Sequence, residues 1–204
     1  MTTEVKPNYH HGNLRQALMD GALHCIREHG AEHLSLRALA RELGVSQAAP
    51  YRHFKDKIAL LSALASDGFE RLGKAMRHAF EQAGSDPESC LRQVGLTYVK
   101  FAMQHPETYR LMFGMKASDF NSKEMDAGHG EGFCVLEDVI RMGLEGKVFA
   151  PHASSDIATA AWCMVHGYAS LLIDGVIDLD EQQAMLQFQG IEQVLNKGIV
   201  GKAS

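Results

Sequence analysis

The chain has 204 residues, of which 46% are hydrophobic and 22% charged, with a formal net charge of -5. This balance is typical of a globular chain with a core of its own, in one domain or two small ones, and the acidic total does not by itself suggest a nucleic-acid partner. The N-terminal residues lack an apolar run, and no stretch reaches the roughly 18 apolar residues of a membrane span. We therefore expect no signal peptide, no membrane partner and a cytoplasmic location.

The charge is unevenly distributed along the chain. Residues 1–60, here called the head, hold eight lysines and arginines against six acidic residues, for a net charge of +2. Residues 61–204, the body, hold 12 against 19, for a net charge of -7. A mildly basic head on an acidic body suits a DNA-reading unit joined to a unit with a different task.

Helical periodicity dominates and strand-like alternation is nearly absent, which predicts an all-α fold. In the head we expect a first helix between Asn13 and Gly30, a second over 36–43 and a third over 47–54. A serine precedes each of the last two helices and can cap it.

In the body we expect a long fourth helix, which Asp56 caps, and five further helices, so that the chain has about nine in all. The polar segment 116–130 is expected to be a loop. The expected helices are 57–82, 88–104, 106–113, 130–145, 155–176 and 180–197.

The segment "SLRALARELGVSQAAPYRHF", residues 35–54, has the order of a helix-turn-helix unit. It contains a capping serine, a helix, a turn with glycine, a second capping serine and a second helix. In such units the second helix enters the major groove of DNA. Residues 35–54 are therefore the predicted DNA-reading element.

Pro50 interrupts the predicted third helix. Its missing N–H would have bonded to the Ser46 carbonyl, and its ring disfavours helical angles at Ala49. We expect a first turn that is opened or tightened, followed by a regular turn from Tyr51 to Phe54. Two purposes remain open: a stiffened reading segment, or a proline that fills an apolar slot.

The side chains of this segment suit contacts with DNA. Gln47 can form a bidentate pair with adenine. Small side chains can meet a thymine methyl group, and polar ones can reach phosphates on either side. These residues are Ala48, Ala49, Tyr51, His53, Lys55 and Lys57.

The run "LSLRALARELGVSQAAPYRHFKDKIALLSAL" resembles the DNA-binding head of the tetracycline-repressor (TetR) family over about residues 10–65. The resemblance implies an all-helical homodimer that binds a palindromic operator and whose body binds a small-molecule effector, most often as a repressor. By position, Ser35, Tyr51, His53 and Lys57 would contact phosphates. The leading base readers would be Arg37 and Gln47, with Arg52 as a second reader. The full candidate set is Ser35, Arg37, Ser46, Gln47, Ala48, Ala49, Tyr51, Arg52, His53, Lys55 and Lys57.

A second resemblance lies in the body. Trp162, His166 and Gly167 have the W-x3-H-G spacing of a C-terminal domain found on some members of this family, and 105–114 is similar to a matching segment there. In those proteins the last two long helices pair with those of a second chain. The resemblance implies a homodimer through 155–176 and 180–197.

Several aromatic and methionine residues of the body are candidates for an apolar effector pocket. Trp162 and His166 lie one helical turn apart and share a face. The same residues can equally be ordinary core or interface residues, and the sequence names no ligand. The candidates are Met103, Tyr109, Met112, Phe113, Phe133, Trp162 and His166.

Other classes of function find less support. For a metal site the chain offers His10 with His11, and His29 with His33, but no cysteine at ligand spacing, so no metal or cofactor is expected. No nucleophile elbow, HExxH motif or glycine-rich phosphate loop indicates an enzyme. The alternatives that stay open are a helical small-molecule-binding protein without specific DNA binding, and an activator of the same family.

Overall fold

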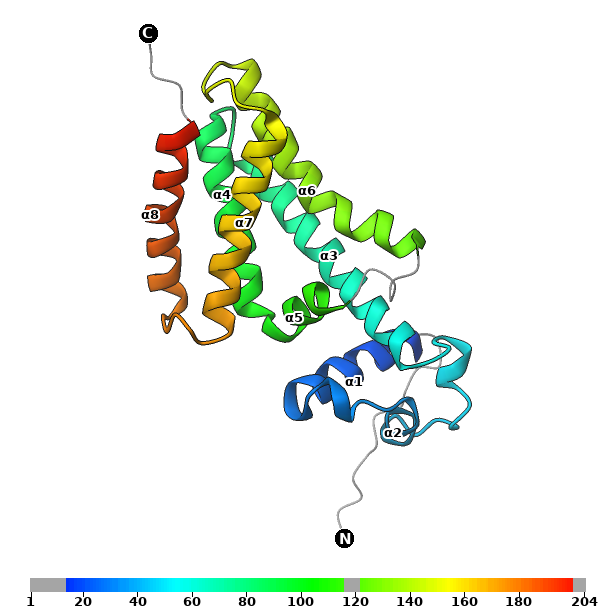
Figure 1. Cartoon of the computed structure of the whole chain (residues 1–204). Coiled ribbons are helices and arrows are strands. Elements are labelled where there is room, and N and C mark those ends of the chain that lie inside the picture. Colours follow the sequence, from blue (N-terminus) through cyan, green and yellow to red (C-terminus); the bar gives the residue numbers. More distant parts are fainter. Residues whose placement is uncertain (1–13, 116–121, 200–204) are drawn as a thin grey trace.

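The computed structural model describes residues 14–115 and 122–199, without the side chains of 122–129 and 199. Over these residues the chain forms eight α-helices and two short 3-10 helices, and no β-strand occurs there. The all-α prediction is therefore confirmed (Figure 1). Asn13, the expected cap of the first helix, lies outside the described residues.

The head is a small helical unit with its own core. It contains α1 (Leu14–His29), η2 (Ala31–His33), α2 (Leu36–Glu42) and η3 (Pro50–Arg52). The first turns of α3 (Lys57–Gln82) complete it. Its buried core residues are Leu18, Met19, Ala22, Ile26, Leu34, Leu36, Leu39, Phe54, Leu60, Ala63 and Leu64.

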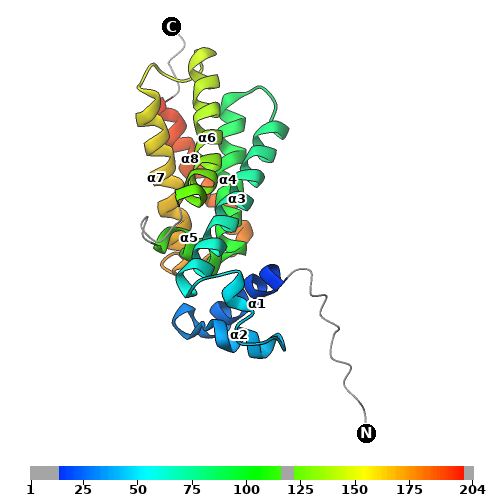
Figure 2. The same cartoon turned by 90° about the vertical axis from the view of Figure 1, so that its right-hand side faces the viewer.

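The body is a bundle around the rest of α3. It adds α4 (Pro87–Gln104), α5 (Pro106–Gly114), α6 (Ser122–Glu145), α7 (Ser154–Ile173) and α8 (Glu181–Ile199). α3 runs from the head into the bundle, where α4, α5 and α6 pack against it (Figures 1 and 2). α7 and α8 lie beside each other on the side of the bundle that is away from α3 (Figure 1).

Capping side chains mark the beginnings of three helices close to where the sequence analysis predicts them. Asp56 caps α3 through a hydrogen bond from the Ala59 N–H at 2.8 Å, as predicted. Asp86 caps α4 in the same way. Asp180 and Gln183 cap α8 reciprocally, each side chain accepting a bond from the other's backbone N–H. Such caps satisfy backbone donors that the helix leaves open.

Two expectations were wrong. The segment 47–54 is not an α-helix, which reduces the count from nine α-helices to eight. Of the expected loop 116–130, residues 116–121 lie outside the described residues, but α6 already begins at Ser122. Within the part of α6 that was predicted, Arg77 of α3 pairs with Glu131 at 3.3 Å.

Head and body are joined by α3 and also by α5. Leu111 of α5 packs against both hydrophobic cores. Gly68 lets α3 approach α5 closely, because a Cβ at this position would lie 2.7 Å from atoms of Thr108 and Met112. α5 is thus in contact with both α3 and the head core.

Candidate DNA-binding face and effector cavity

The turn of the predicted helix-turn-helix unit is formed as expected. Gly44 adopts a φ of 66°, a left-handed conformation that side-chain-bearing residues avoid. The Val45 N–H then bonds to the Ala40 carbonyl at 2.9 Å. The turn leads directly into the segment that carries the candidate base readers.

That segment is tightened throughout. The Ala49 N–H bonds to the Ser46 carbonyl, and the Arg52 N–H bonds to the Ala49 carbonyl, both three residues apart. One α-type bond follows, from the Phe54 N–H to the Pro50 carbonyl at 3.0 Å. The expected regular turn after Pro50 is therefore a 3-10 turn that ends in a single α-type bond.

Pro50 explains this geometry. The Ser46 carbonyl, which has no proline N–H to accept, accepts the Ala49 N–H instead, and this bond closes a tighter turn. Ala49 nevertheless adopts helical angles of φ -61° and ψ -44°, which the following proline was expected to disfavour. The Pro50 ring is buried, so it occupies an apolar slot beneath the segment.

The candidate DNA-contacting side chains lie on the outer surface of the head. Ala49 and Lys57 are half-buried. The Ser35 side chain does not cap α2 by a hydrogen bond, contrary to expectation, and its hydroxyl remains on the surface. The exposed members are Ser35, Arg37, Ser46, Gln47, Ala48, Tyr51, Arg52, His53 and Lys55.

Lys57 makes a contact within the protein in addition to the phosphate contact predicted for it. Its Nζ donates a hydrogen bond to the Glu32 carbonyl at 3.0 Å, which ties the start of α3 to η2. The ammonium group is thereby held beside the N-terminus of α3, where anions are favoured.

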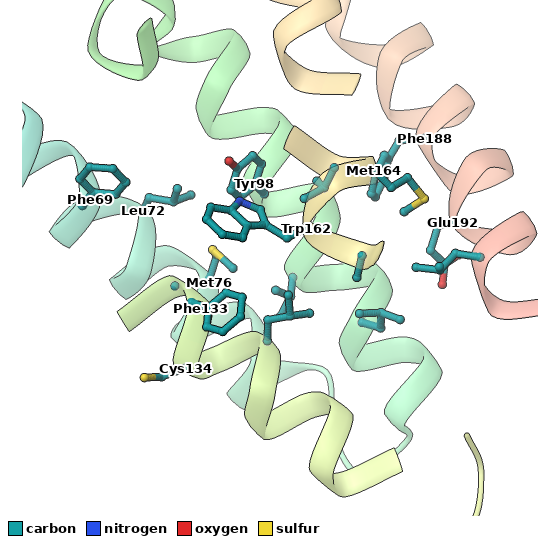
Figure 3. A pocket seen from close by; sticks show the side chains of 18 of the residues that line it. Phe69, Leu72, Met76, Tyr98, Phe133, Cys134, Trp162, Met164, Phe188 and Glu192 are labelled. Atoms are coloured by element: carbon teal, nitrogen blue, oxygen red, sulfur yellow. The ribbon is translucent and has the colours of Figure 1, made fainter. Parts of the chain in front are cut away.

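The body contains a cavity of about 570 Å³ between α3, α4, α5, α6, α7 and α8. Phe69 and Leu72 of α3 lie on one side and Phe188 of α8 on the other, with Trp162 of α7 between them (Figure 3). The size is typical of small-molecule sites. The lining is mainly aromatic and aliphatic, and it includes Met76, Val94, Gly95, Tyr98, Leu136, Met164, Val165, Glu192 and Leu195.

Three of the seven candidate pocket residues border this cavity, namely Phe113, Phe133 and Trp162. The Phe133 and Trp162 rings meet edge to face at 5.5 Å. The other four do not line the cavity. Tyr109 and Met112 are core residues, 1% exposed, while Met103 and His166 are half-buried, and Met103 packs against the body core.

His166 belongs to a buried hydrogen-bond network next to the cavity. Its Nδ1 lies 2.7 Å from the Tyr109 hydroxyl and 3.1 Å from the Tyr98 hydroxyl. In the neutral ring, Nδ1 either accepts a bond from one of these hydroxyls or donates its own proton to one, according to the tautomer. Burial lowers the pKa of His166, raises the pKa of Tyr98, and raises the pKa of Tyr109 to about 12.

The sequence interpretation missed several lining residues, among them Phe69, Phe188 and Glu192. The signal for Glu192 was a single acid on the otherwise apolar face of α8 that carries Phe188, Ile191 and Leu195. An acid in that position is buried and therefore needs partners.

The described residues hold no cluster of three or more histidines, cysteines or acids that suits a metal ion. His29 ends α1 and His33 lies in η2, so the two are not one turn apart on a helix as the spacing suggested. His10 and His11 lie outside the described residues.

Comparisons with known families match both parts of the chain. Residues 18–64 match a model described as bacterial regulatory proteins, tetR family. Residues 91–191 match a tetracyclin repressor-like C-terminal domain. The W-x3-H-G type is not the one matched.

Individual proteins extend this similarity. The transcriptional repressor AcnR of Corynebacterium efficiens is 38% identical over 168 residues, which cover 81% of this chain and 80% of that protein. The class D tetracycline repressor of Escherichia coli is 30% identical over 105 residues, but these cover 52% of this chain and only 47% of the repressor. A solved structure of a protein of unknown function from Rhodococcus sp. RHA1 is 33% identical, with a TM-score of 0.83 over 96% of this chain and 100% of that one.

Proposed function

The chain belongs to the tetR family of bacterial regulatory proteins, and we propose that it is a transcriptional repressor which binds a palindromic operator as a homodimer and is released by a small-molecule effector. The observation that carries the proposal is the combination of the two sites. The head presents exposed polar side chains on a helix-turn-helix unit, and the body contains a cavity of about 570 Å³.

In this proposal the head reads DNA through the exposed side chains of α2 and of the tightened segment. Arg37 and Gln47 contact base edges, and Arg52 is the second reader. Ser46, Ala48 and Ala49 lie close to the bases, and the residues that contact phosphates are Ser35, Tyr51, His53, Lys55 and Lys57. Exposure of most of this set supports the assignment, since direct readout needs side chains that are free to reach the groove.

The dimer forms through α7 and α8. α7 is apolar enough, at a mean hydropathy of 1.2, to pass a membrane-span test of length and composition, although only 39% of that stretch is buried within one chain. Large apolar side chains stay exposed on both helices: Leu171 is 42% exposed, Leu186 70% and Val194 72%. A second copy of α7 and α8 would cover these residues, so we assign the apolar surface to a protein partner and keep the cytoplasmic location.

The proposed domain boundary follows from the two hydrophobic cores. We propose residues 1–60 as the DNA-binding domain and 61–204 as the ligand-binding and dimerisation domain. The change between the two cores, from Leu64 to Ala65 within α3, supports a boundary near this point. We also retain the W-x3-H-G type as a proposal for the body, supported by the position of Trp162 and His166 on one side of α7 beside the cavity.

Release follows from a shift of α3 and α5. The two heads of a dimer fit one face of DNA when their reading elements lie about 34–36 Å apart. Phe113 lines the cavity and Leu111, on the same helix, packs against the head core, so an occupied cavity can alter this spacing. An effector achieves this only if it binds the two states with different affinity.

The proposal is tested by selection from a random-sequence duplex pool at about 0.1–0.2 M salt. A two-fold symmetric motif is expected, with affinity that falls steeply as salt rises. Arg37→Ala and Gln47→Ala should each lower affinity by about 10–100-fold and broaden the motif at one position per half-site. Arg27→Ala, which removes an exposed charge from α1 outside the reading element, is the control and should keep the motif.

Three results would each contradict a part of the proposal. Absence of enrichment with full-length protein would favour a helical small-molecule-binding protein without specific DNA binding. Enrichment of one motif by wild type and both variants alike would reject Arg37 and Gln47 as base readers. A reporter in which bound operator raises transcription would instead identify an activator.

A further inference from the structure

One end of the cavity is polar. Glu192 of α8 lines it one turn after Phe188, and its side chain is only 1% exposed. Figure 3 shows both residues on α8, across the cavity from Phe69 and Leu72 of α3. The cavity reaches solvent beside Cys134 and Trp162, which border it and are both exposed. A ligand that enters there meets aromatic side chains first and the carboxylate last.

The cation that pairs with the Glu192 carboxylate lies outside the cavity lining. Arg92 of α4 donates from Nε to Glu192 Oε2 at 3.3 Å, but Arg92 is not among the described residues that line the cavity. Its side chain is 35% exposed, so its other N–H groups can bond to water. The cavity therefore presents carboxylate oxygens to a ligand, not the guanidinium group.

The same end has hydrogen-bond acceptors without matching donors. Glu192 Oε1 accepts a bond from Asn196 Nδ2, which leaves lone pairs on both carboxylate oxygens. Asn196 is 6% exposed and, like Arg92, is not among the described residues that line the cavity, so the acceptor that a ligand meets at this end is Glu192. A buried acceptor is unfavourable without a donor, so a ligand that brings a donor to the remaining lone pairs of Glu192 is stabilised.

We propose that the effector is an apolar molecule that carries an amine at one end, with its apolar part against the aromatic side chains and its ammonium group on Glu192. The inference rests on the proposed function, in which this cavity takes the effector. A ligand with a carboxylate at the same end would face the Glu192 carboxylate in a water-poor site, which is strongly unfavourable.

The test uses three probes with one ten-carbon chain: decylamine, decan-1-ol and decanoate. Trp162 is the single tryptophan of the chain and borders the cavity, so its emission reports occupancy in the full-length protein. At pH 7 wild type should bind the amine at least about tenfold tighter than decanoate, with the alcohol between them.

Glu192→Gln keeps the size of the side chain and removes its charge, and it should abolish the preference for the amine. Glu181→Gln is the matched control, because it removes an exposed charge from the first turn of the same helix and should leave the preference unchanged. Arg92→Gln combined with Glu192→Gln removes both ions of the pair. If Glu192→Gln alone does not fold because Arg92 is left unpaired, this double variant is used in its place. It should show the same loss of preference for the amine.

Each other outcome overturns the inference at a different point. Decanoate binding as tightly as the amine would reject the amine while leaving the cavity as the effector site. An amine preference that survives the loss of Glu192 would reject the role of this residue. Unchanged Trp162 emission with all three probes would reject the cavity itself, whereas DNA selection, which needs no effector, would still decide whether the protein is a regulator.

Discussion

In the head, the proposed functional side chains are exposed and stand on short elements, whereas in the body the residues around the cavity are mostly buried and stand on long helices. Tyr51 is 46% exposed at the DNA-binding face, while Tyr98 at the cavity is 4% exposed. An exposed side chain can change with little effect on folding, but a buried one supports both the fold and the site. The head should therefore separate function from stability, and the body should not.

Packing in the body is tight at several glycines. A Cβ at Gly143 of α6 would overlap the ring of Phe149, which is 3% exposed in the body core. At the cavity, a Cβ at Gly95 would lie 2.7 Å from the Phe188 ring. These contacts leave no room for a methyl group, so the positions of Phe149 and Phe188 depend on glycine.

The largest expected effect is that of Gly143→Ala. The added methyl group must displace Phe149 or α6, which should lower the free energy of unfolding by about 3 kcal/mol. For a chain of this size the Tm should fall by roughly 6–12 °C. Thermal unfolding followed by circular dichroism measures the change.

Gly114→Ala is the control for this change. Gly114 is exposed at the end of α5, and among the described residues no atom beyond its own local backbone lies within 4 Å of an added Cβ. It should unfold close to wild type. Equal Tm values for Gly143→Ala and wild type would show that the body packs loosely, and the contrast with the head would fail.

The two regions also differ in how much the sequence could predict. Local signals fix the ends of the elements in and beside the head, such as Asp56, whose side chain caps α3, and Gly44 in the turn. The 3-10 form of residues 50–52 was not predicted. It depends on which backbone N–H bonds to the Ser46 carbonyl, because Pro50 has no N–H to donate.

In the body, periodicity identified the helices but not the way they face one another. Phe113, Phe133 and Trp162 border the cavity, whereas Tyr109 and Met112 of the same candidate set lie in the core. Whether an apolar side chain lines a cavity or fills the core depends on the rotation and separation of several helices, which no local pattern encodes. Glu192 was also missed, although a lone acid on an apolar face is a local signal of a polar site within a core.

An intermediate effect is expected for Pro50→Leu, which tests the separation of function and stability within the head. The Pro50 ring is buried, unlike the exposed candidate base readers, so DNA sequence preference should stay as in wild type. The larger leucine should lower the free energy of unfolding by about 1 kcal/mol. Selection from the duplex pool and thermal unfolding together measure both quantities.

Ala48→Leu is the matched comparison, because it adds bulk at an exposed position only two residues away. It should leave stability nearly unchanged and weaken operator binding. If Pro50→Leu changes the selected motif while Ala48→Leu does not, then the proline shapes the reading surface and the filling of an apolar slot is not its main role.

The smallest effect concerns the pH dependence of the body. Burial lowers the pKa of His166 below its value in the unfolded chain, so the unfolded state binds more protons as the pH falls below about 6.5. The stability associated with a neutral His166 is fully present above that pH and is lost as the pH falls toward the folded-state pKa. Wild type should therefore unfold at a lower temperature at pH 5.5 than at pH 7.5, and His166→Gln should reduce this difference.

His105, whose pKa is also lowered by burial and by Arg71, accounts for a part of the pH dependence that persists in the variant. Replacement of His78, an exposed residue of α3, should leave the wild-type difference in place, and the assignment to His166 would fail if His78→Gln had the larger effect.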